Sequence, residues 1–359
     1  MEAVRLPQLL TSLFFMATFF IAFMVNSLYI WTLGFKMTKT VSSIWILHLI
    51  MTSWIFTILL PIFSVTVLMD MHWVLGKALC KIISGLGLLC MYASVIILMI
   101  ISLDRYVLVI HPLSVRSCRT IKRSKVICGA VWILAFLLSI PELVFMDTKQ
   151  VEKNRTFCFR NYALSENWDS PEANAIRQKN HWAMFIFQFI FGFILPFMVI
   201  CYCYITIAMK MKMKKLNKSK KPFQVIMAAI VSFFVCWIPY HLYHGLTIYK
   251  EEISKVVVYA MYMVSAILCC VNVCCTPILY LFIGENFKEV FKKSILTLIE
   301  KAFNEDLNSI GGSKEKTLEL SVSAVCERRM ALEDDGKTST AALEAAPNML
   351  TVPCYTLSR

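Results

Sequence analysis

The chain has 359 residues, of which 58% are hydrophobic and only 16% are charged. A soluble protein of this length needs more charge to cover its surface, so the composition argues against a soluble protein and indicates an integral membrane protein. The formal net charge of +13 requires no nucleic-acid partner, because the basic residues gather in particular loops.

Seven apolar runs follow one another along the chain, each near or above the ~20 residues that a helix needs to cross the hydrocarbon core. Lipid cannot hydrogen-bond exposed backbone, and the runs lack the alternating pattern of barrel strands, so they are expected to be packed helices. We therefore predict an all-α fold, a seven-transmembrane helix bundle. The predicted spans are Leu9–Leu33, Val41–Leu68, Leu79–Ile110, Val126–Phe145, Trp182–Met209, Phe223–Ile248 and Val256–Ile283.

The distribution of lysine and arginine predicts the orientation of the bundle. The loop after the first run carries Lys36 and Lys39, and the basic stretches 116–125 and 210–221 contain no acidic residue. The long loop between the fourth and fifth runs instead mixes both signs of charge. Because basic loops stay in the cytoplasm, we expect a multi-pass plasma-membrane protein with residues 1–8 outside the cell and the C-terminus inside.

Two further segments are expected after the membrane domain, which we place at residues 9–283. Residues 284–300 put hydrophobic side chains on one helical face and lysines elsewhere, which is typical of a helix on the inner leaflet. The alternative is a helix packed on another cytoplasmic domain, and the sequence offers no such domain. Residues 301–359 are rich in Ser, Thr, Glu and Ala without periodicity, so we predict a disordered tail.

Two of the 14 cysteines are expected on the extracellular side. Cys80 lies at the outer end of the third run and Cys158 in the long outer loop, where a disulfide would persist and tie the loop to the bundle. Asn154 begins an Asn-Arg-Thr glycosylation sequon in the same loop, although such triplets also arise by chance. No cysteine or histidine spacing is typical of zinc, so we expect no metal and no cofactor.

The stretch "ISLDRYVLVIHP" sets Asp104 beside Arg105 at the cytoplasmic end of the third run. Ionisable residues at membrane depth are costly unless paired, and they usually mark function. Arg105 can lean on Asp104 in one state and be released to a partner in another, which would make a latch. An arginine that merely anchors the helix at the interface explains the pair equally well.

This stretch, with Tyr106 and the following His-Pro, resembles the Asp-Arg-Tyr signature of rhodopsin-like G-protein-coupled receptors. Other motifs of that family occur in order, one per helix. The segments "CWIPYH", "KKPFQVIMAAIVSFFVC" and "LYLFIGENFKEVFKKSIL" are most similar to sequences of the chemoattractant branch. That branch includes formyl-peptide, anaphylatoxin, chemerin and prostaglandin D2 receptors. The matching positions are Asn26, the Trp-x-x-Gly of "HWVLGKALCK", Trp132, Pro196 with Tyr204, "FFVCWIPYH" and "NVCCTPILY".

The resemblance implies a ligand-triggered switch. An extracellular ligand would press on the region of Trp237, and the sixth helix would swing outward about Pro239. The implied activation pivot consists of Phe233, Trp237, Pro239, Thr276 and Pro277. The implied coupling switch consists of Asp104, Arg105, Tyr106, Leu113, Tyr204 and Tyr280. Matched positions also outline a ligand pocket of Phe63, Ser84, Gly87, Leu88, Gln188, Tyr240, His241, His244, Tyr262 and Ala266.

Three departures from the family pattern affect these expectations. Ser53 stands where the family has a sodium-binding aspartate, and Thr276 replaces the Asn or Asp of the seventh helix. Gln188 stands where the branch often has an Arg or Lys that grips a ligand carboxylate. Arg177 or Lys179 could supply that charge instead, unless both are simply solvated.

The predicted function is a cell-surface receptor that activates inhibitory heterotrimeric G proteins on binding an extracellular peptide or lipid acid. The coupling type rests on analogy with the branch, and arrestin and receptor kinases are further expected partners. The alternative is an atypical receptor that recruits arrestin or scavenges ligand without G-protein signalling. An opsin is excluded because residues 256–283 contain no lysine, and no residue spacing supports an enzyme or a transporter.

Overall fold

The computed structural model describes residues 6–113, 118–151, 155–165, 170–213, 221–249 and 252–280, and for residues 221–225, 255, 276 and 278–280 it describes the backbone alone. The chain divides into two compact units, Met1–Phe291 and Lys292–Arg359. Only the first contains described residues. The predicted amphipathic helix 284–300, the predicted tail 301–359 and Asn154 lie outside the described residues.

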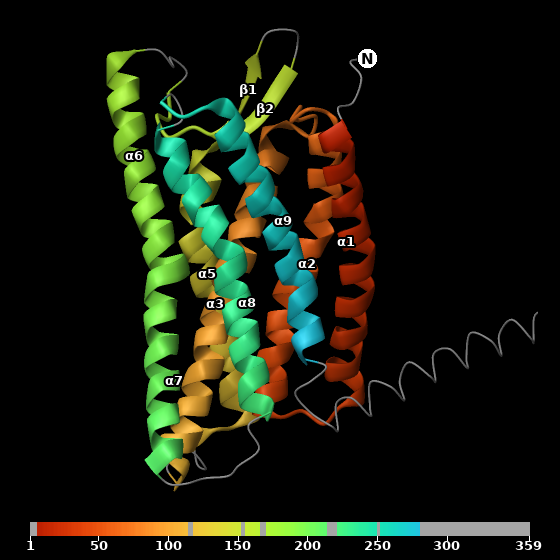
Figure 1. The fold of residues 1–359 in the computed structure, drawn as a ribbon, viewed down its shortest axis with the longest axis vertical. Coiled ribbons are helices and arrows are strands. Elements are labelled where there is room, and N and C mark those ends of the chain that lie inside the picture. The colour runs from red at the N-terminus through yellow and green to blue at the C-terminus, as the bar shows by residue number, and fades with distance from the viewer. Residues whose placement is uncertain are drawn as a thin grey trace, which may run out of the picture. The chain divides into compact units, whose positions relative to one another are not determined.

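Seven segments of the described chain are apolar and long enough to cross a membrane, which confirms the predicted bundle (Figure 1). The fifth of them is one continuous rod, in which a short π-helix, η3, joins α6 to α7. The elements are α1 (Leu6–Trp31), η1 (Thr32–Lys36), α2 (Val41–Leu68), α3 (Gly76–Ile110), α5 (Ile121–Phe145), α6 (Pro171–Phe189), η3 (Ile190–Ile194), α7 (Leu195–Met213), α8 (Lys221–Leu246), η4 (Thr247–Tyr249) and α9 (Lys255–Tyr280).

Two helices, α5 and α6, begin well before the predicted apolar runs, because capping residues set their starts. α6 begins at Pro171 rather than Trp182: the Ser170 side chain accepts a hydrogen bond from the Ala173 backbone, and proline occupies the first turn. α5 begins at Ile121, where the Thr120 side chain accepts from the Arg123 backbone. A hydropathy pattern detects only the apolar part of a helix, so it misses these polar first turns.

α3 is the central helix of the bundle. The apolar window of α3 is 61% buried, whereas the windows of α1, α5 and the fifth rod are each 28% buried. The main core forms around its Met91, Tyr92 and Ile97, which other helices surround. The outer helices turn large hydrophobic side chains such as Ile133 away from the protein, as contact with lipid requires.

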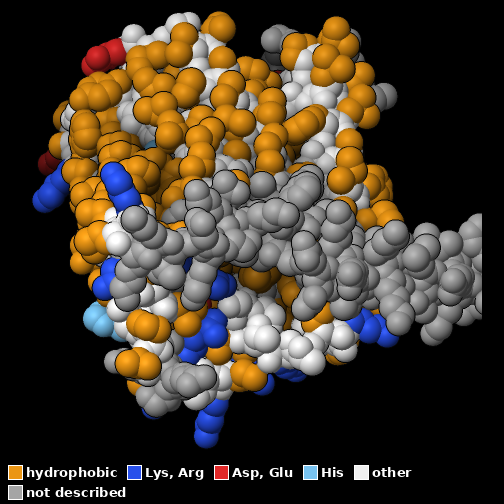
Figure 2. Space-filling view, turned by 60° about the horizontal axis from the view of Figure 1, so that its bottom comes forward, with side chains coloured by type: hydrophobic (Ala, Val, Ile, Leu, Met, Phe, Trp, Pro, Cys, Tyr) orange, Lys and Arg blue, Asp and Glu red, His pale blue; other side chains and the backbone are white. Residues whose placement is uncertain are grey.

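The two ends of the bundle differ in charge and structure. Hydrophobic side chains cover its flank in Figure 2, and Lys and Arg side chains gather toward the end that comes forward. We call this the basic end; α3 finishes there, α5 begins there, and α7 contributes Lys210 and Lys212. The opposite end carries a β-hairpin and is called the hairpin end (Figure 1).

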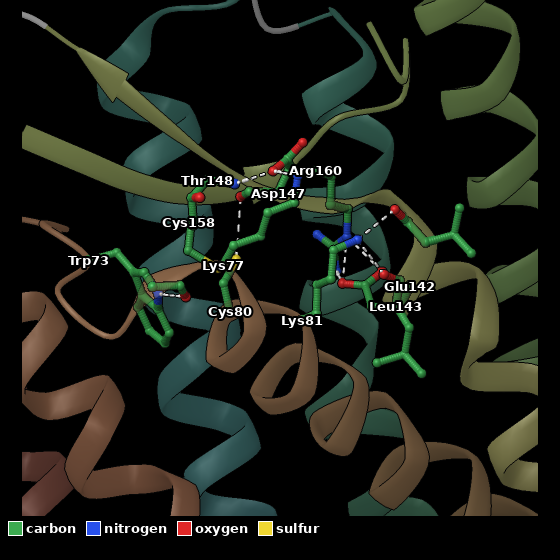
Figure 3. The surroundings of a disulfide bond; sticks show 12 residues. Trp73, Lys77, Cys80, Lys81, Glu142, Leu143, Asp147, Thr148, Cys158 and Arg160 are labelled. Atoms are coloured by element: carbon green, nitrogen blue, oxygen red, sulfur yellow. Dashed lines mark hydrogen bonds and ion pairs between the residues drawn. A yellow bond between two sulfur atoms is a disulfide. The ribbon is translucent and has the colours of Figure 1, made fainter. Parts of the chain in front are cut away.

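The hairpin lies between α5 and α6 and was not expected from the sequence. Strand β1 (Met146–Val151) pairs antiparallel with β2 (Arg155–Arg160), with Thr148 opposite Cys158. The predicted disulfide between Cys80 of α3 and Cys158 of β2 is confirmed, with the two Cα atoms 5.7 Å apart. It ties the hairpin to the central helix (Figure 3).

Candidate functional site

A cavity of about 730 Å³ lies at the hairpin end. All seven rods and the hairpin contribute to its walls: α1, α2, α3, α6, α8 and α9 line it, and α5 adds Glu142 from its last turn. The volume lies in the range of small-molecule sites. Aromatic side chains dominate the wall, among them Phe56, Phe63, Trp237 and Tyr262.

Eight of the ten predicted pocket residues line this cavity. They are Phe63, Ser84, Gly87, Leu88, Tyr240, His244, Tyr262 and Ala266. Gln188 and His241 do not line it, and the predicted set needs correction there. Both are nearly fully buried. The His241 ring packs instead against Phe189 and Phe193, with ring centroids 5.6 and 5.3 Å apart, because it faces the fifth rod.

The most prominent polar feature of the wall is an ion pair that the sequence reasoning did not single out. Arg160 of β2 donates through Nε to both carboxylate oxygens of Glu142, at 2.8 and 2.9 Å, and its Nη2 lies 2.7 Å from Oε1 (Figure 3). The same Nη2 donates at 3.5 Å to the Tyr240 hydroxyl. The Glu142 side chain is only 1% exposed, so this carboxylate requires its partner.

Both members of the pair were visible in the sequence. Glu142 is an acid in the apolar stretch "LLSIPELVF", where an unpaired charge would be costly. Arg160 follows Cys158 by two residues, so it lies on the same face of β2 as the disulfide. The register of the hairpin, with Met146 opposite Arg160, brings the guanidinium back over the end of α5.

Polar contacts at the hairpin end hold the hairpin in place. Lys77 lies 2.9 Å from Asp147, whose carboxylate also accepts from the Thr148 backbone (Figure 3). The Asn161 side chain donates to the same carboxylate. Partial desolvation opposes ionisation, but these three donors and the charge of Lys77 lower the pKa of Asp147 below its usual value. Nearby, the Lys81 ammonium donates to the Leu143 carbonyl at 2.8 Å and so caps α5.

Trp237 connects the cavity to the core. Its indole lines the cavity, and its ring centroid lies 5.8 Å from that of Phe233 and 5.3 Å from that of Tyr240. Phe233 belongs to the same buried cluster as Tyr204 of α7, nearer the basic end. Pro239 lies inside α8 and Pro277 inside α9, so prolines interrupt the backbone hydrogen bonding of both helices.

At the basic end, the acid of the Asp-Arg-Tyr signature pairs with an unexpected arginine. Arg119, just before α5, donates to the two carboxylate oxygens of Asp104 at 2.8 and 3.1 Å. Arg119 rather than Arg105 therefore holds Asp104 in this structure, so the paired state of the predicted latch is not the one seen here. Successive helical side chains point about 100° apart, and Asp104 faces the loop before α5.

Arg105 turns toward α2 instead. Its Nη2 donates to the Ser42 hydroxyl at 2.9 Å, and Arg119 Nη2 donates to the same oxygen at 2.9 Å. Arg105 Nε is buried and has no hydrogen-bond partner among the described residues. One serine thus bridges two arginines, and among the described residues only Arg119 is held by a carboxylate.

The other predicted switch residues lie around this network. Tyr204 is buried, the Tyr106 ring packs 5.9 Å from the ring of Tyr202, and Leu113 is 87% exposed. The side chains of Thr276 and Tyr280 lie outside the described residues.

The position of the family's sodium site carries hydroxyl groups. Ser53 is buried and its hydroxyl contacts the Leu49 carbonyl at 3.5 Å. The neighbouring Thr52 hydroxyl lies 2.7 Å from that of Ser94, so two neutral groups satisfy one another. A hydroxyl pair supplies none of the negative charge that an aspartate would bring to a cation.

Known proteins with a similar sequence are receptors. Residues 25–280 match the family model described as 7 transmembrane receptor (rhodopsin family). The chain is 43% identical over 281 residues to the probable G-protein coupled receptor 33 of Homo sapiens, covering 78% of this chain and 84% of that protein. It is 34% identical over 292 residues to chemerin-like receptor 1 of Rattus norvegicus, covering 80% and 78% respectively. These similarities confirm the resemblance that the motifs predict.

Proposed function

We propose that this chain, which belongs to the rhodopsin family of seven-transmembrane receptors, is a chemoattractant-type receptor that activates inhibitory heterotrimeric G proteins. Members of the family are receptors and not enzymes. The chain is accordingly a multi-pass receptor of the plasma membrane, with an extracellular ligand and a G protein as partners. The inhibitory type of G protein, arrestin and receptor kinases belong to the proposal.

In the proposed orientation the hairpin end faces the outside of the cell. The disulfide of Cys80 with Cys158 supports this orientation, because such bonds persist in an oxidising compartment. The lysines and arginines of the basic end support a cytoplasmic location for that end. Asn154 would then be an extracellular glycosylation site.

The observation that carries the proposal is the position of Trp237. This side chain is at once part of the cavity wall and packed on Phe233 in the core. A ligand that displaces the indole would also disturb the buried cluster that reaches Tyr204. We propose that α8 then swings outward about Pro239, which needs no break in a hydrogen bond at that residue.

The proposed outcome at the basic end is the release of Arg105. The side chain gives up the Ser42 hydroxyl and meets the G protein together with Tyr204 and Tyr280, while exposed Leu113 packs on the same partner. Arg119 keeps Asp104 occupied and thereby prevents it from capturing Arg105. A neutral hydroxyl is a weaker partner for a guanidinium than a carboxylate, so the release is easier.

The alternative is an atypical receptor that recruits arrestin or scavenges ligand without activating G proteins. The neutral pairing of Thr52 with Ser94, beside Ser53, favours it, because the family's charged residue is missing between cavity and switch. The Asp104-Arg105-Tyr106 sequence favours G-protein coupling.

Direct measurement of G-protein activation tests the proposal. Wild type, Arg105→Ala and the matched control Arg123→Ala would be compared in cells at equal surface levels. Each would be tested unstimulated and with formyl peptides, complement fragments, lipid acids and the primary amides of those acids. Arg123 is a basic residue of the same end whose guanidinium contacts only the Cys118 carbonyl among the described residues.

We expect wild type and Arg123→Ala to activate an inhibitory G protein and Arg105→Ala to fail. Arrestin recruitment by the wild type without any G-protein activation would replace the proposal by the atypical receptor. Equal activation by Arg105→Ala and wild type would contradict the role of Arg105.

A further inference from the structure

The charged side chains in the cavity wall balance one another. Among the described lining residues, the acids are Glu142 and Glu252 and the bases are Arg160 and Arg177. With histidine counted as neutral, their formal charges sum to zero. A site that grips an anion by charge usually presents an excess of cationic groups, so this wall lacks the excess that a carboxylate anchor requires.

The most buried charge of the wall is already neutralised. Arg160 makes three close contacts with the Glu142 carboxylate, which is 1% exposed. A ligand carboxylate placed against Arg160 would lie beside the Glu142 carboxylate, and a ligand ammonium placed against Glu142 would lie beside the guanidinium. Either charge would give up its hydration without gaining an uncompensated partner. The pair therefore disfavours both signs of charge.

Neutral hydrogen-bonding groups remain available around the same point. His244 lines the cavity and is 2% exposed, and its Nε2 has no hydrogen-bond partner among the described residues. The His244 ring centroid lies 4.6 Å from that of Tyr240, whose hydroxyl accepts from Arg160. A neutral imidazole nitrogen donates or accepts according to tautomer, so it suits a ligand amide or hydroxyl.

We propose that this cavity selects a small aromatic or apolar ligand whose innermost polar group is uncharged, a primary amide or a hydroxyl, and that Glu142 sets this preference. The inference rests on the proposed function in one respect, namely that the cavity is the ligand site. It replaces the expected carboxylate ligand by a neutral one. Removing the charge of Glu142 while keeping its shape would leave Arg160 uncompensated and convert the cavity into an anion site.

Four probes with one carbon skeleton test the preference: 4-phenylbutanoic acid, its primary amide, the corresponding alcohol and the corresponding amine. Their effect on the thermal unfolding midpoint of the purified full chain would be measured at neutral pH in lipid nanodiscs. The variants are Glu142→Gln and the double variant Glu142→Gln with Arg160→Gln. The matched control is Asp147→Asn, which removes one negative charge from the hairpin at a residue that does not line the cavity.

The amide and the alcohol are expected to raise the wild-type midpoint more than the acid and the amine do. In Glu142→Gln the acid should gain about tenfold in apparent affinity and become the best probe, since an uncompensated arginine now faces it. Asp147→Asn should rank the probes as wild type does. The double variant, which has no arginine to expose, should show no gain for the acid.

Three results would overturn the inference: a wild type that prefers the acid, an unchanged ranking in Glu142→Gln, or no shift from any of the four probes. If Glu142→Gln does not fold, the ranking of the four probes by the wild type and by the double variant still tests the inference. Because binding is measured without a G protein, a receptor that prefers the amide but never couples would contradict the proposed signalling alone. A receptor that couples but prefers the acid would contradict this inference alone.

Discussion

Each end of the bundle holds an arginine that comes from a loop or strand and grips an acid near the end of a helix. At the hairpin end Arg160 holds Glu142, and at the basic end Arg119 holds Asp104. The two acids differ in burial: the Glu142 side chain is 1% exposed and that of Asp104 is 10% exposed, whereas Arg160 and Arg119 are similarly exposed, at 23% and 25%. They also differ in their surroundings, because Arg119 shares the Ser42 hydroxyl with a second arginine.

This difference indicates two roles for the same chemical contact. A pair taken out of water is costly to break and suits a permanent wall, whereas a pair near solvent contributes little stability and can exchange partners. Breaking the hairpin-end pair should therefore change the stability and the ligand preference of the receptor. Breaking the basic-end pair should instead change G-protein activation.

The largest effect is expected from Arg160→Ala. It leaves the Glu142 carboxylate buried without its cation, which should lower the free energy of unfolding by about 3–5 kcal/mol. Thermal unfolding of the purified receptor and its surface level in cells would measure this. Lys149→Ala is the control, because it removes an exposed cation from the same hairpin. Equal midpoints for the two variants would mean that the pair is not structural.

Arg119→Ala should lower stability by only about 1 kcal/mol or less, but it should reduce G-protein activation about fivefold. Once released, Asp104 is free to pair with adjacent Arg105 and hold it back. Activation would be measured at equal surface levels. The double variant Arg119→Ala with Asp104→Asn removes the competing carboxylate and should restore activation. An increase in Arg119→Ala alone would refute the competition.

A smaller effect is expected from pH at the hairpin. Hydrogen bonds and Lys77 lower the pKa of Asp147 in the folded protein, so Asp147 contributes stability that is fully present above its unfolded pKa of about 3.9. This contribution is lost as the pH falls through the folded pKa. The unfolding midpoint of wild type should exceed that of Asp147→Asn at pH 7, and the gap should close on acidification below about pH 4. If the difference between the two midpoints widens on acidification, the pKa of Asp147 is not lowered in the folded protein and the prediction is contradicted.

The smallest effect concerns sodium, which we expect not to change the thermal stability of the receptor. Ser53 and the hydroxyl pair of Thr52 with Ser94 offer no negative charge at the position of the family's sodium site. Exchanging sodium for potassium at constant ionic strength should not shift the unfolding midpoint. Ser53→Asp should make the midpoint depend on sodium. An unfolding midpoint of the wild type that depends on sodium would show that the site binds sodium without an aspartate.

The membrane spans were predictable from the sequence because lipid enforces them. A run that crosses hydrocarbon must be apolar and helical wherever it lies in the bundle, so α2 has the predicted bounds Val41–Leu68. Helix starts made by polar caps, such as Ser170, escaped a hydropathy criterion. The disulfide was also predictable, since only Cys80 and Cys158 were expected on the extracellular side.

Partner choice could not be predicted, because it depends on helix rotation and on the path of the connecting chain. The sequence shows Asp104 beside Arg105, yet α3 turns the carboxylate toward Arg119. It shows Glu142 in an apolar run, yet only the hairpin register and the bond to Cys80 bring Arg160 over it. The sequence by itself determined the seven helices and their disulfide, since local composition controls partition into lipid. The tertiary structure alone decided which charges meet, since electrostatic contacts act over a few ångströms between distant segments.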